Sequence, residues 1–177
     1  MSTLDTSPTT AQPRRAAGQR LADALAHFAR IPHSLIALLA RVSVAVTFWL
    51  SGQTKIEGLV LDPLGGTVQL GWPRISENAV ELFRSEYALP LLPPELATYL
   101  AAVAEHVFPL LLLVGLASRL SALALLGMTL VIQLFVYPAA FATHGLWAVS
   151  LLYVMSRGPG VLSLDALIAR RYGVSTR

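Results

Sequence analysis

The sequence predicts an all-α integral membrane protein, a four-helix bundle with short amphipathic interfacial helices. Hydrophobic residues make up 55% of the chain and charged residues only 13%, whereas a soluble domain carries about 25% charged residues. The stretch from Leu120 to Ser156 contains no Asp, Glu, Lys or Arg. As one helix it would be about 55 Å long, nearly twice the ~30 Å hydrocarbon core of a bilayer. It must therefore hold two spans, joined by the small and polar residues between Pro138 and Gly145.

Helix signals along the chain predict four spans, at residues 34–54, 95–116, 119–137 and 143–156. Pro32 stands just before the first span, where a helix tolerates proline. Pro94 starts the second span and is followed by an acidic residue in the first turn, which suits the helix dipole. The fourth span is the shortest, and we expect it to gain a turn from residues 139–142. Residues 34–156 therefore form one membrane domain of four spans.

Two tails flank this domain. In the N-terminal tail, residues 1–33, apolar side chains between residues 16 and 30 share one helical face with arginines around it. That pattern favours an interfacial helix on an anionic membrane surface, although an arginine-rich, acid-poor start is also typical of an organellar transit peptide. In the C-terminal tail, residues 157–177, Ser163 is expected to cap a short helix that Gly173 ends.

The longest connection is the loop of residues 55–95, between the first and second spans. Gly65-Gly66 and Gly71-Trp72-Pro73 are typical of turns. Asn78 followed by Glu81 matches a capping box. The apolar residues after it share a face, so we expect a short amphipathic helix that lies on the outer surface or covers the bundle.

Charge sets the expected direction of the spans. Both tails are rich in arginine, and Arg119 lies in the turn between the second and third spans, whereas acidic residues outnumber basic ones in the loop of residues 55–95. Because positive segments stay on the cytoplasmic side, both termini are expected in the cytoplasm and the long loop outside. In a bacterium this describes a multi-pass protein of the inner (plasma) membrane, with the loop in the periplasm.

Composition also excludes several kinds of chemistry. The chain has no Cys, so it holds no dithiol relay, iron–sulfur cluster or thiolate metal site. No basic stripe interleaved with aromatics is present, so nucleic acid is not an expected partner. His106 and His144 are the histidines of the spans, and their estimated depths differ by about 15 Å, too far for a bis-histidine haem. A metal site at Glu105 and His106 would need a third ligand that the sequence does not indicate, and His144 is expected at a wet interface.

The most informative polar residues are Glu105 and His106, near the middle of the second span, with Pro109 one turn further on. A charged group at that depth costs at least ~2.5–3.5 kcal/mol, so it must be paired, protonated or functional. Arg41, in the first span, is the expected partner of Glu105. Two interpretations stay open: a structural ion pair that holds the bundle together, or a site in which Glu105, His106 and Arg41 do chemistry.

Four further residues are candidates for ligand binding. Gly52 and Lys55 share a helical face with Arg41; glycine permits close approach of a helix or ligand, and the lysine either faces a ligand or extends to lipid phosphates. Gln133 and Tyr137 belong to a polar stripe on the third span. Such side chains either hydrogen-bond a ligand or hold helices together.

The order and spacing of several motifs resemble the DoxX family over residues 35–167: Arg41, Ser51-Gly52-Gln-Thr-Lys55, Glu105, Gly115-Leu-Ala-Ser-Arg119, and Arg157-Gly-Pro-Gly-Val-Leu-Ser-Leu-Asp165. The resemblance implies a four-helix integral membrane protein similar to the membrane part of thiosulfate:quinone oxidoreductase. A fold shared with that family does not by itself assign a reaction.

Three functions are compatible with these features. The first is a quinone-interacting subunit of a membrane redox system, an oxidoreductase subunit in which Glu105 and His106 exchange protons, Arg41 tunes them and Gln133 or Tyr137 binds a carbonyl. Its electrons would come from a periplasmic protein partner. The second is a non-enzymatic membrane anchor or assembly subunit, and the third a small transporter. A homo-oligomer in the lipid bilayer is compatible with each.

Overall fold

The computed structural model describes residues 19–20, 22–23, 25–26 and 30–173. The chain divides into two units, Met1–Pro32 and His33–Arg177, and the second unit carries the bundle. The interfacial helix expected over residues 16–30 lies largely outside the described residues. The fold below is that of the second unit.

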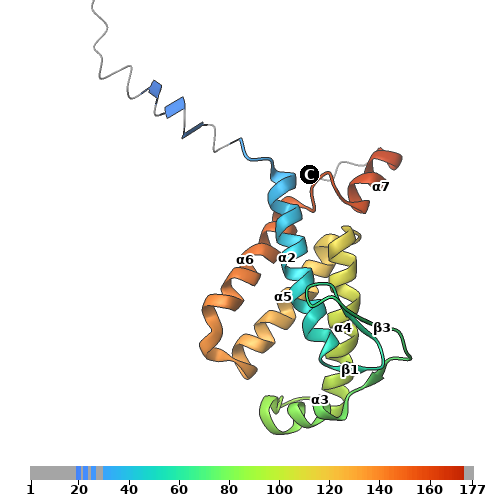
Figure 1. Cartoon of the computed structure of the whole chain (residues 1–177). Helices are drawn as coiled ribbons and strands as arrows, with labels where there is room; N and C mark the ends of the chain where they lie inside the picture. Colours follow the sequence, from blue (N-terminus) through green and yellow to red (C-terminus); the bar gives the residue numbers. More distant parts are fainter. Residues whose placement is uncertain (1–18, 21, 24, 27–29, 174–177) are drawn as a thin grey trace, which may run out of the picture. The chain divides into compact units, whose positions relative to one another are not determined.

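Four long helices form the bundle (Figure 1): α2 (His33–Gln53), α4 (Pro94–Val114), α5 (Ser118–Val131) and α6 (Phe141–Arg157). The π-helix η2 (Ile132–Val136) continues α5, and the 3-10 turn η3 (Pro138–Ala140) precedes α6. With these extensions, each of the four is long and apolar enough to cross a membrane. The predicted all-α bundle of four spans is confirmed, including the extra turn before the fourth span.

The helices close into a ring, because α2 and α5 each pack against both α4 and α6. Seven buried side chains fill the centre: Val44, Phe48, Leu112, Ala122, Leu125, Leu151 and Val154. Small polar side chains are buried where helices meet, among them Thr98, Ser118, Ser121 and Thr129. Thr98 and Thr129 donate to the carbonyls of Pro94 and Leu125 in their own helices. Small residues at helix contacts are typical of membrane bundles, where close packing replaces the hydrophobic effect.

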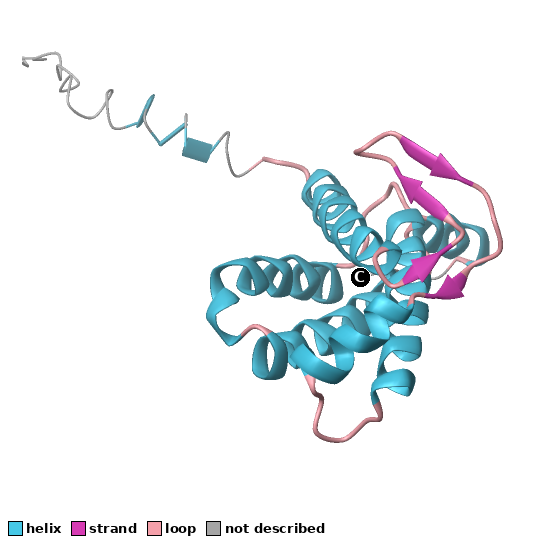
Figure 2. Ribbon diagram, turned by 60° about the horizontal axis from the view of Figure 1, so that its bottom comes forward, coloured by secondary structure: helices cyan, strands magenta, loops and turns pink. Residues whose placement is uncertain are grey.

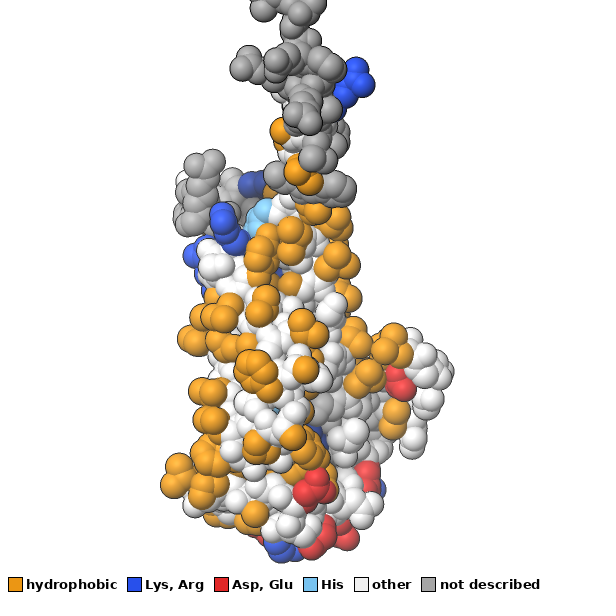
Figure 3. All heavy atoms as spheres, turned by 90° about the vertical axis from the view of Figure 1, so that its left-hand side faces the viewer, with side chains coloured by type: hydrophobic (Ala, Val, Ile, Leu, Met, Phe, Trp, Pro, Cys, Tyr) orange, Lys and Arg blue, Asp and Glu red, His pale blue; other side chains and the backbone are white. Residues whose placement is uncertain are grey.

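Apolar side chains cover the outside of the bundle (Figure 3). Leucines and valines on α4, α5 and α6 are largely exposed, among them Val107, Leu130 and Val149. In water this surface would be far larger than the apolar patch of a normal monomer. It suits lipid, and the chain is therefore a multi-pass membrane protein in contact with the bilayer.

The loop between α2 and α4 is more ordered than the sequence predicted (Figure 2). It holds two antiparallel pairs of strands, β1 (Ile56–Glu57) with β4 (Arg74–Ile75) and β2 (Val60–Asp62) with β3 (Thr67–Gln69), followed by α3 (Glu77–Leu82) and the π-helix η1 (Phe83–Tyr87). Gly58 and Gly71 pass so closely at the base of the β2–β3 hairpin that a Cβ on Gly71 would lie 2.5 Å from the Gly58 carbonyl oxygen. The strands are too short to show an alternating pattern, which is why the sequence indicated only turns.

The expected capping box of α3 is wrong. The helix begins two residues earlier than expected, with Ser76 rather than Asn78 at the cap position. Ser76 gives α3 no side-chain cap, because its hydroxyl donates to Glu57 Oε1 at 2.7 Å. A tertiary contact to β1 has therefore replaced the local one.

The end of the bundle opposite α3 is fixed by the segment after α6. As predicted, Ser163 caps α7 (Leu164–Tyr172) by accepting from the Ala166 amide, and Gly173 ends it at φ 65°. The Asp165 carboxylate accepts from the amides of Ala117 and Ser118 at 2.8 and 2.9 Å, at the start of α5. The short helix is thus tied to the turn between α4 and α5.

Candidate functional site

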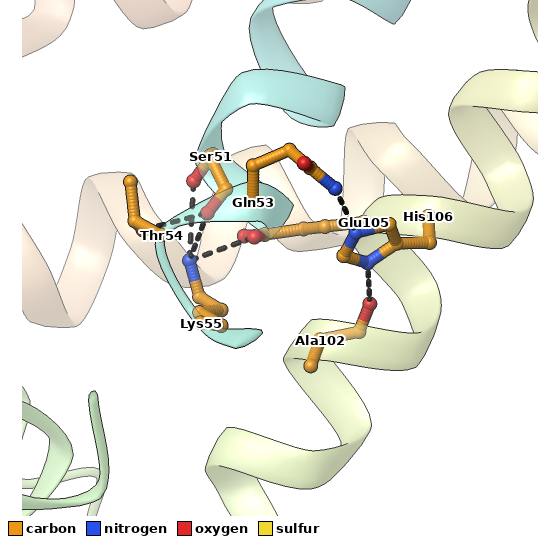
Figure 4. A network of polar contacts seen from close by, with 7 residues as sticks. All are labelled: Ser51, Gln53, Thr54, Lys55, Ala102, Glu105 and His106. Atoms are coloured by element: carbon orange, nitrogen blue, oxygen red, sulfur yellow. Dashed lines mark hydrogen bonds and ion pairs between the residues drawn. The ribbon is translucent and has the colours of Figure 1, made fainter. Parts of the chain in front are cut away.

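The centre of the candidate site is a buried ion pair between Lys55 and Glu105 (Figure 4). Lys55 Nζ lies 2.7 Å from Glu105 Oε2, and the two side chains are only 8% and 4% exposed. Lys55 Nζ also lies 3.1 Å from the Ser51 hydroxyl and 3.2 Å from the Ser51 carbonyl, one turn back in the chain. The ammonium group therefore has three oxygen partners, which offsets the cost of burying a charge.

Gly52 makes this pairing possible. A Cβ at Gly52 would lie 2.9 Å from His106 Cε1 and 3.1 Å from Glu105 Cβ. The absence of a side chain lets α2 and α4 approach at the level of Glu105, which brings the end of α2 within reach of the carboxylate. The close approach expected of Gly52 is confirmed, and its neighbour there is a helix.

The expected ion pair between Arg41 and Glu105 is wrong. Arg41 Nη2 donates to the Leu162 carbonyl at 2.8 Å, in the segment before α7. Gly115 leaves room for the guanidinium, since a Cβ there would meet Arg41 Nη1. The sequence did not distinguish the two possible partners, because Arg41 and Lys55 lie on the same face of α2.

His106 lies beside Glu105 at the contact between α2 and α4 but is not part of the ion pair. Its Nδ1 lies 2.6 Å from the Ala102 carbonyl, which only accepts, so Nδ1 is the donor of this bond. Its Nε2 lies 2.9 Å from Gln53 Nε2, and Gln53 Oε1 accepts from the Leu61 amide at 2.6 Å. The ring also packs edge-on to Trp49, with centroids 4.9 Å apart. The imidazole thus links α4 to α2 and, through Gln53, to β2.

A cavity of about 440 Å³ lies beside the ion pair, between α4, α5 and α6. Lys55 and Glu105 form its polar wall on one side, and His144 faces it from α6. Phe83 and Tyr87 of η1 also line it. This volume falls within the ~300–1,000 Å³ of small-molecule sites, which combine apolar walls with a few polar groups in this way.

The cavity is covered by η1, which a hydrogen bond fastens to the end of α5. Tyr137 Oη donates to Glu86 Oε1 at 2.9 Å, and the Tyr137 ring packs edge-on to Tyr87. Hydrogen bonding by Tyr87 and then by Glu86 raises the pKa of Tyr137 above its ordinary value. The phenol therefore stays protonated and keeps the cover in place. Of the two positions that the sequence left open for this segment, on the outer surface or over the bundle, the structure shows the second.

His144 is the residue that sequence reasoning underestimated. It is buried rather than wet, and its Nδ1 lies 2.7 Å from Gln133 Oε1. Gln133 Nε2 donates to the Pro138 carbonyl at 2.6 Å, so its oxygen is the end that faces the histidine. His144 Nδ1 is then the donor, and Nε2 is the ring nitrogen left for a ligand. The π-turn of η2 sets the direction of Gln133, and no pattern in the sequence indicates such a turn.

The structure thus divides the candidate residues into three groups. Lys55, Glu105 and Tyr137 line one cavity, and Gln133 supports it from behind His144. Gly52 and His106 lie beside Glu105 within the α2–α4 contact. Arg41 belongs to the other end of the bundle. Within residues 30–173, no three His, Asp or Glu side chains gather as a metal site would require.

Four apolar helices around an internal cavity with an ion pair in its wall define a multi-pass membrane protein of the four-helix type. A family model described as DoxX matches residues 36–138, more than half of the chain, so this chain belongs to the DoxX family. No curated protein and no solved structure matches it. The match covers the first three spans and agrees with the resemblance seen in the motifs.

Proposed function

We propose that this protein is a quinone-interacting subunit of a membrane redox system, with the quinone head group bound in the cavity beside Lys55 and Glu105. The observation that carries the proposal is an apolar cavity with three polar groups in its wall. Lys55 can donate to a ligand in place of one of its two Ser51 contacts, Glu105 accepts or donates according to its protonation, and His144 accepts at Nε2. The quinone/quinol pair has the matching shape and polarity, a flat apolar ring whose carbonyl accepts from Lys55 and whose hydroxyl, in the quinol, donates to Nε2 of His144.

The way into the cavity favours a ligand that arrives from the lipid. Leu100 on α4 and Val131 at the end of α5 line the cavity, yet they are 48% and 40% exposed on the outside of the bundle. Small residues, including Ala101, Ala104 and Gly127, line the cavity between these two helices. A passage between α4 and α5 would admit a ring whose isoprenoid tail stays in the bilayer.

The chemistry assigned to this chain is proton exchange. Reduction of a quinone to a quinol takes up two electrons and two protons, and the reverse reaction releases them. Glu105 and His144 are placed to supply or accept the protons at the two sides of the cavity. Because the chain has no Cys, the electrons come from a redox partner protein, which we place in the periplasm against the loop of residues 55–95.

In this proposal the roles of two expected catalytic residues change. His106 and Arg41 act as positioning residues, since one links α4 to β2 and the other holds the segment before α7. Gln133 acts through His144, whose tautomer it sets. Tyr137 holds the cover, and its phenol is near enough to the cavity to contact a bound ring.

The test is binding of a short-tailed ubiquinone analogue to the protein in lipid nanodiscs. Gly127→Leu should abolish binding by filling the cavity, since a Cβ at Gly127 meets nothing within 4 Å and the helix is not strained. Gly145→Leu on α6 is the matched control, because Gly145 does not line the cavity. Glu105→Gln should weaken binding about tenfold, as loss of one charge-assisted hydrogen bond does. Failure of the wild type to bind, or equal binding by Gly127→Leu, would exclude this site.

A non-enzymatic membrane anchor is the second candidate. It is favoured by the completeness of the Lys55–Glu105 contact, in which each charge already has an opposite partner. An anchor would retain its partner protein when Gly127→Leu fills the cavity and would show no quinone binding at all. Co-purification of the partner with this variant, measured beside quinone binding, separates the two functions.

A further inference from the structure

The β2–β3 hairpin folds back along the transmembrane helices instead of projecting from them. The amide of Leu61 donates to Gln53 Oε1 at 2.6 Å, and its carbonyl accepts from Trp49 Nε1 at 2.7 Å. Trp49 and Gln53 are one turn apart on α2. Trp49 and Gln53 therefore bind the backbone carbonyl and amide of Leu61 at the open edge of β2. Without them, these two backbone groups would need a third strand or water as a partner.

The depth of the hairpin follows from the residues it faces on α4. Asp62, Pro63 and Val68 enclose an apolar groove of about 280 Å³ together with Pro109 and Leu113. Pro109 is 15 residues beyond Pro94, the first residue of α4, which places it about 22 Å along the helix. Pro109 therefore lies in the second half of α4, whereas Trp49, which also lines the groove, lies one turn before the end of α2, so the groove runs beside the membrane-spanning part of both helices. In Figures 1 and 2 the hairpin runs along the flank of the bundle near α4.

Four large apolar side chains of the hairpin are exposed, beside the smaller polar Thr67 and Gln69 of β3. Leu64, Val68, Leu70 and Trp72 are 74%, 69%, 78% and 86% exposed. Asp62 is the one charged residue between Gly58 and Pro73, and its carboxylate is used inside the turn, where it accepts from the amides of Leu64 and Gly65 at 2.9 and 2.8 Å. A loop in water would leave four large apolar side chains wet beside an empty apolar groove.

We infer that the β2–β3 hairpin is a re-entrant element, inserted in the leaflet on the α3 side and in contact with lipid acyl chains through Leu64, Val68, Leu70 and Trp72. Lipid chains also fill the groove against Pro109. Few backbone groups of the strand pair lack a partner, because β3 has only three residues. Leu61 stands opposite Val68 in the pair, and its own amide and carbonyl point to α2. Only the backbone groups of Val68 then point outward from the pair, so the cost of an open edge in lipid stays low.

The native chain has no Cys, so single-cysteine variants test this directly. Val68→Cys and Leu70→Cys are compared with Glu77→Cys on α3, a wet control, and Leu130→Cys on α5, a lipid-facing control. The purified protein in nanodiscs is treated with a membrane-impermeant maleimide. We expect the two hairpin positions to react at least tenfold more slowly than Glu77→Cys. Gln53→Leu, which removes the Leu61 contact, should speed their reaction.

A second measurement identifies what protects the hairpin. A small fluorophore on Leu70→Cys is placed in bilayers of phosphatidylcholine with brominated acyl chains. Quenching similar to that at Leu130→Cys supports insertion in lipid. Labelling of Val68→Cys and Leu70→Cys as fast as that of Glu77→Cys would show that the hairpin lies in water. Slow labelling without quenching would show that another copy of the chain covers it, and either result overturns the inference.

Discussion

Lys55, just beyond α2, and Glu105, in the middle of α4, form the one ion pair with both side chains buried within residues 30–173, at 2.7 Å. The pair joins the first two spans at the level where Gly52 lets them touch. It also forms the polar wall of the cavity. A single contact therefore connects the stability of the bundle with the chemistry proposed for it.

Removal of one partner should cost more stability than removal of both. Lys55→Met leaves the Glu105 carboxylate buried without an opposite charge, which typically costs about 3–5 kcal/mol. The double variant Lys55→Met, Glu105→Leu buries no charge and should regain most of that loss. Reversible unfolding in mixed detergent micelles measures the three free energies. Equal losses in the single and double variants would contradict the assigned pairing.

Substitution of Gly52 should force α2 and α4 apart. Gly52→Val places methyl groups beyond a Cβ that is already 2.9 Å from the His106 ring, and overpacking of this kind costs about 1–3 kcal/mol. Gly127→Ala on α5 is the control, because a Cβ there meets nothing within 4 Å. Thermal unfolding of both variants in the same detergent should show a loss for Gly52→Val alone.

The contact of Tyr137 with η1 should weaken at alkaline pH. The folded protein raises the pKa of Tyr137 above 10.0, which means that the protonated phenol is stabilised. That stability is fully present below about pH 10 and is lost as the pH rises through the higher folded pKa. We therefore expect Tm to fall above about pH 10 in the wild type and to fall less in Tyr137→Phe. Parallel Tm curves in the two proteins would contradict this role.

Asp165 should hold the C-terminal helix against the rest of the bundle. Its carboxylate accepts from two amides at the start of α5, as a capping residue does, so Asp165→Ala should cost about 0.5–2 kcal/mol. Limited proteolysis should then cleave after Arg170 or Arg171 faster than in the wild type. Asp165→Asn keeps one acceptor oxygen and should show a smaller effect. Equal cleavage of all three proteins would contradict the contact.

The sequence alone determined the number, order and approximate limits of the spans. Charge-free apolar runs such as Leu120 to Ser156 have no stable place outside a bilayer. It also indicated the cap and end of α7, because Ser163 and Gly173 act on the backbone beside them. The spans follow from the hydrophobicity of consecutive residues in lipid, and the ends of α7 follow from contacts between neighbouring residues. Both depend on residues close together in the chain, so both can be predicted from the sequence.

Only the tertiary structure decided which polar groups meet. Arg41 and Lys55 lie on one face of α2. The position of α2 relative to α4 along the helix axes places Lys55, and not Arg41, beside Glu105. His144 came to face the cavity through the π-turn that directs Gln133 toward it. The hairpin followed from side chains of α2 that bond to its backbone. These three contacts depend on the relative positions of helices and loops. Those positions are set by the packing of many residues from different segments, so no pattern within one segment predicts them.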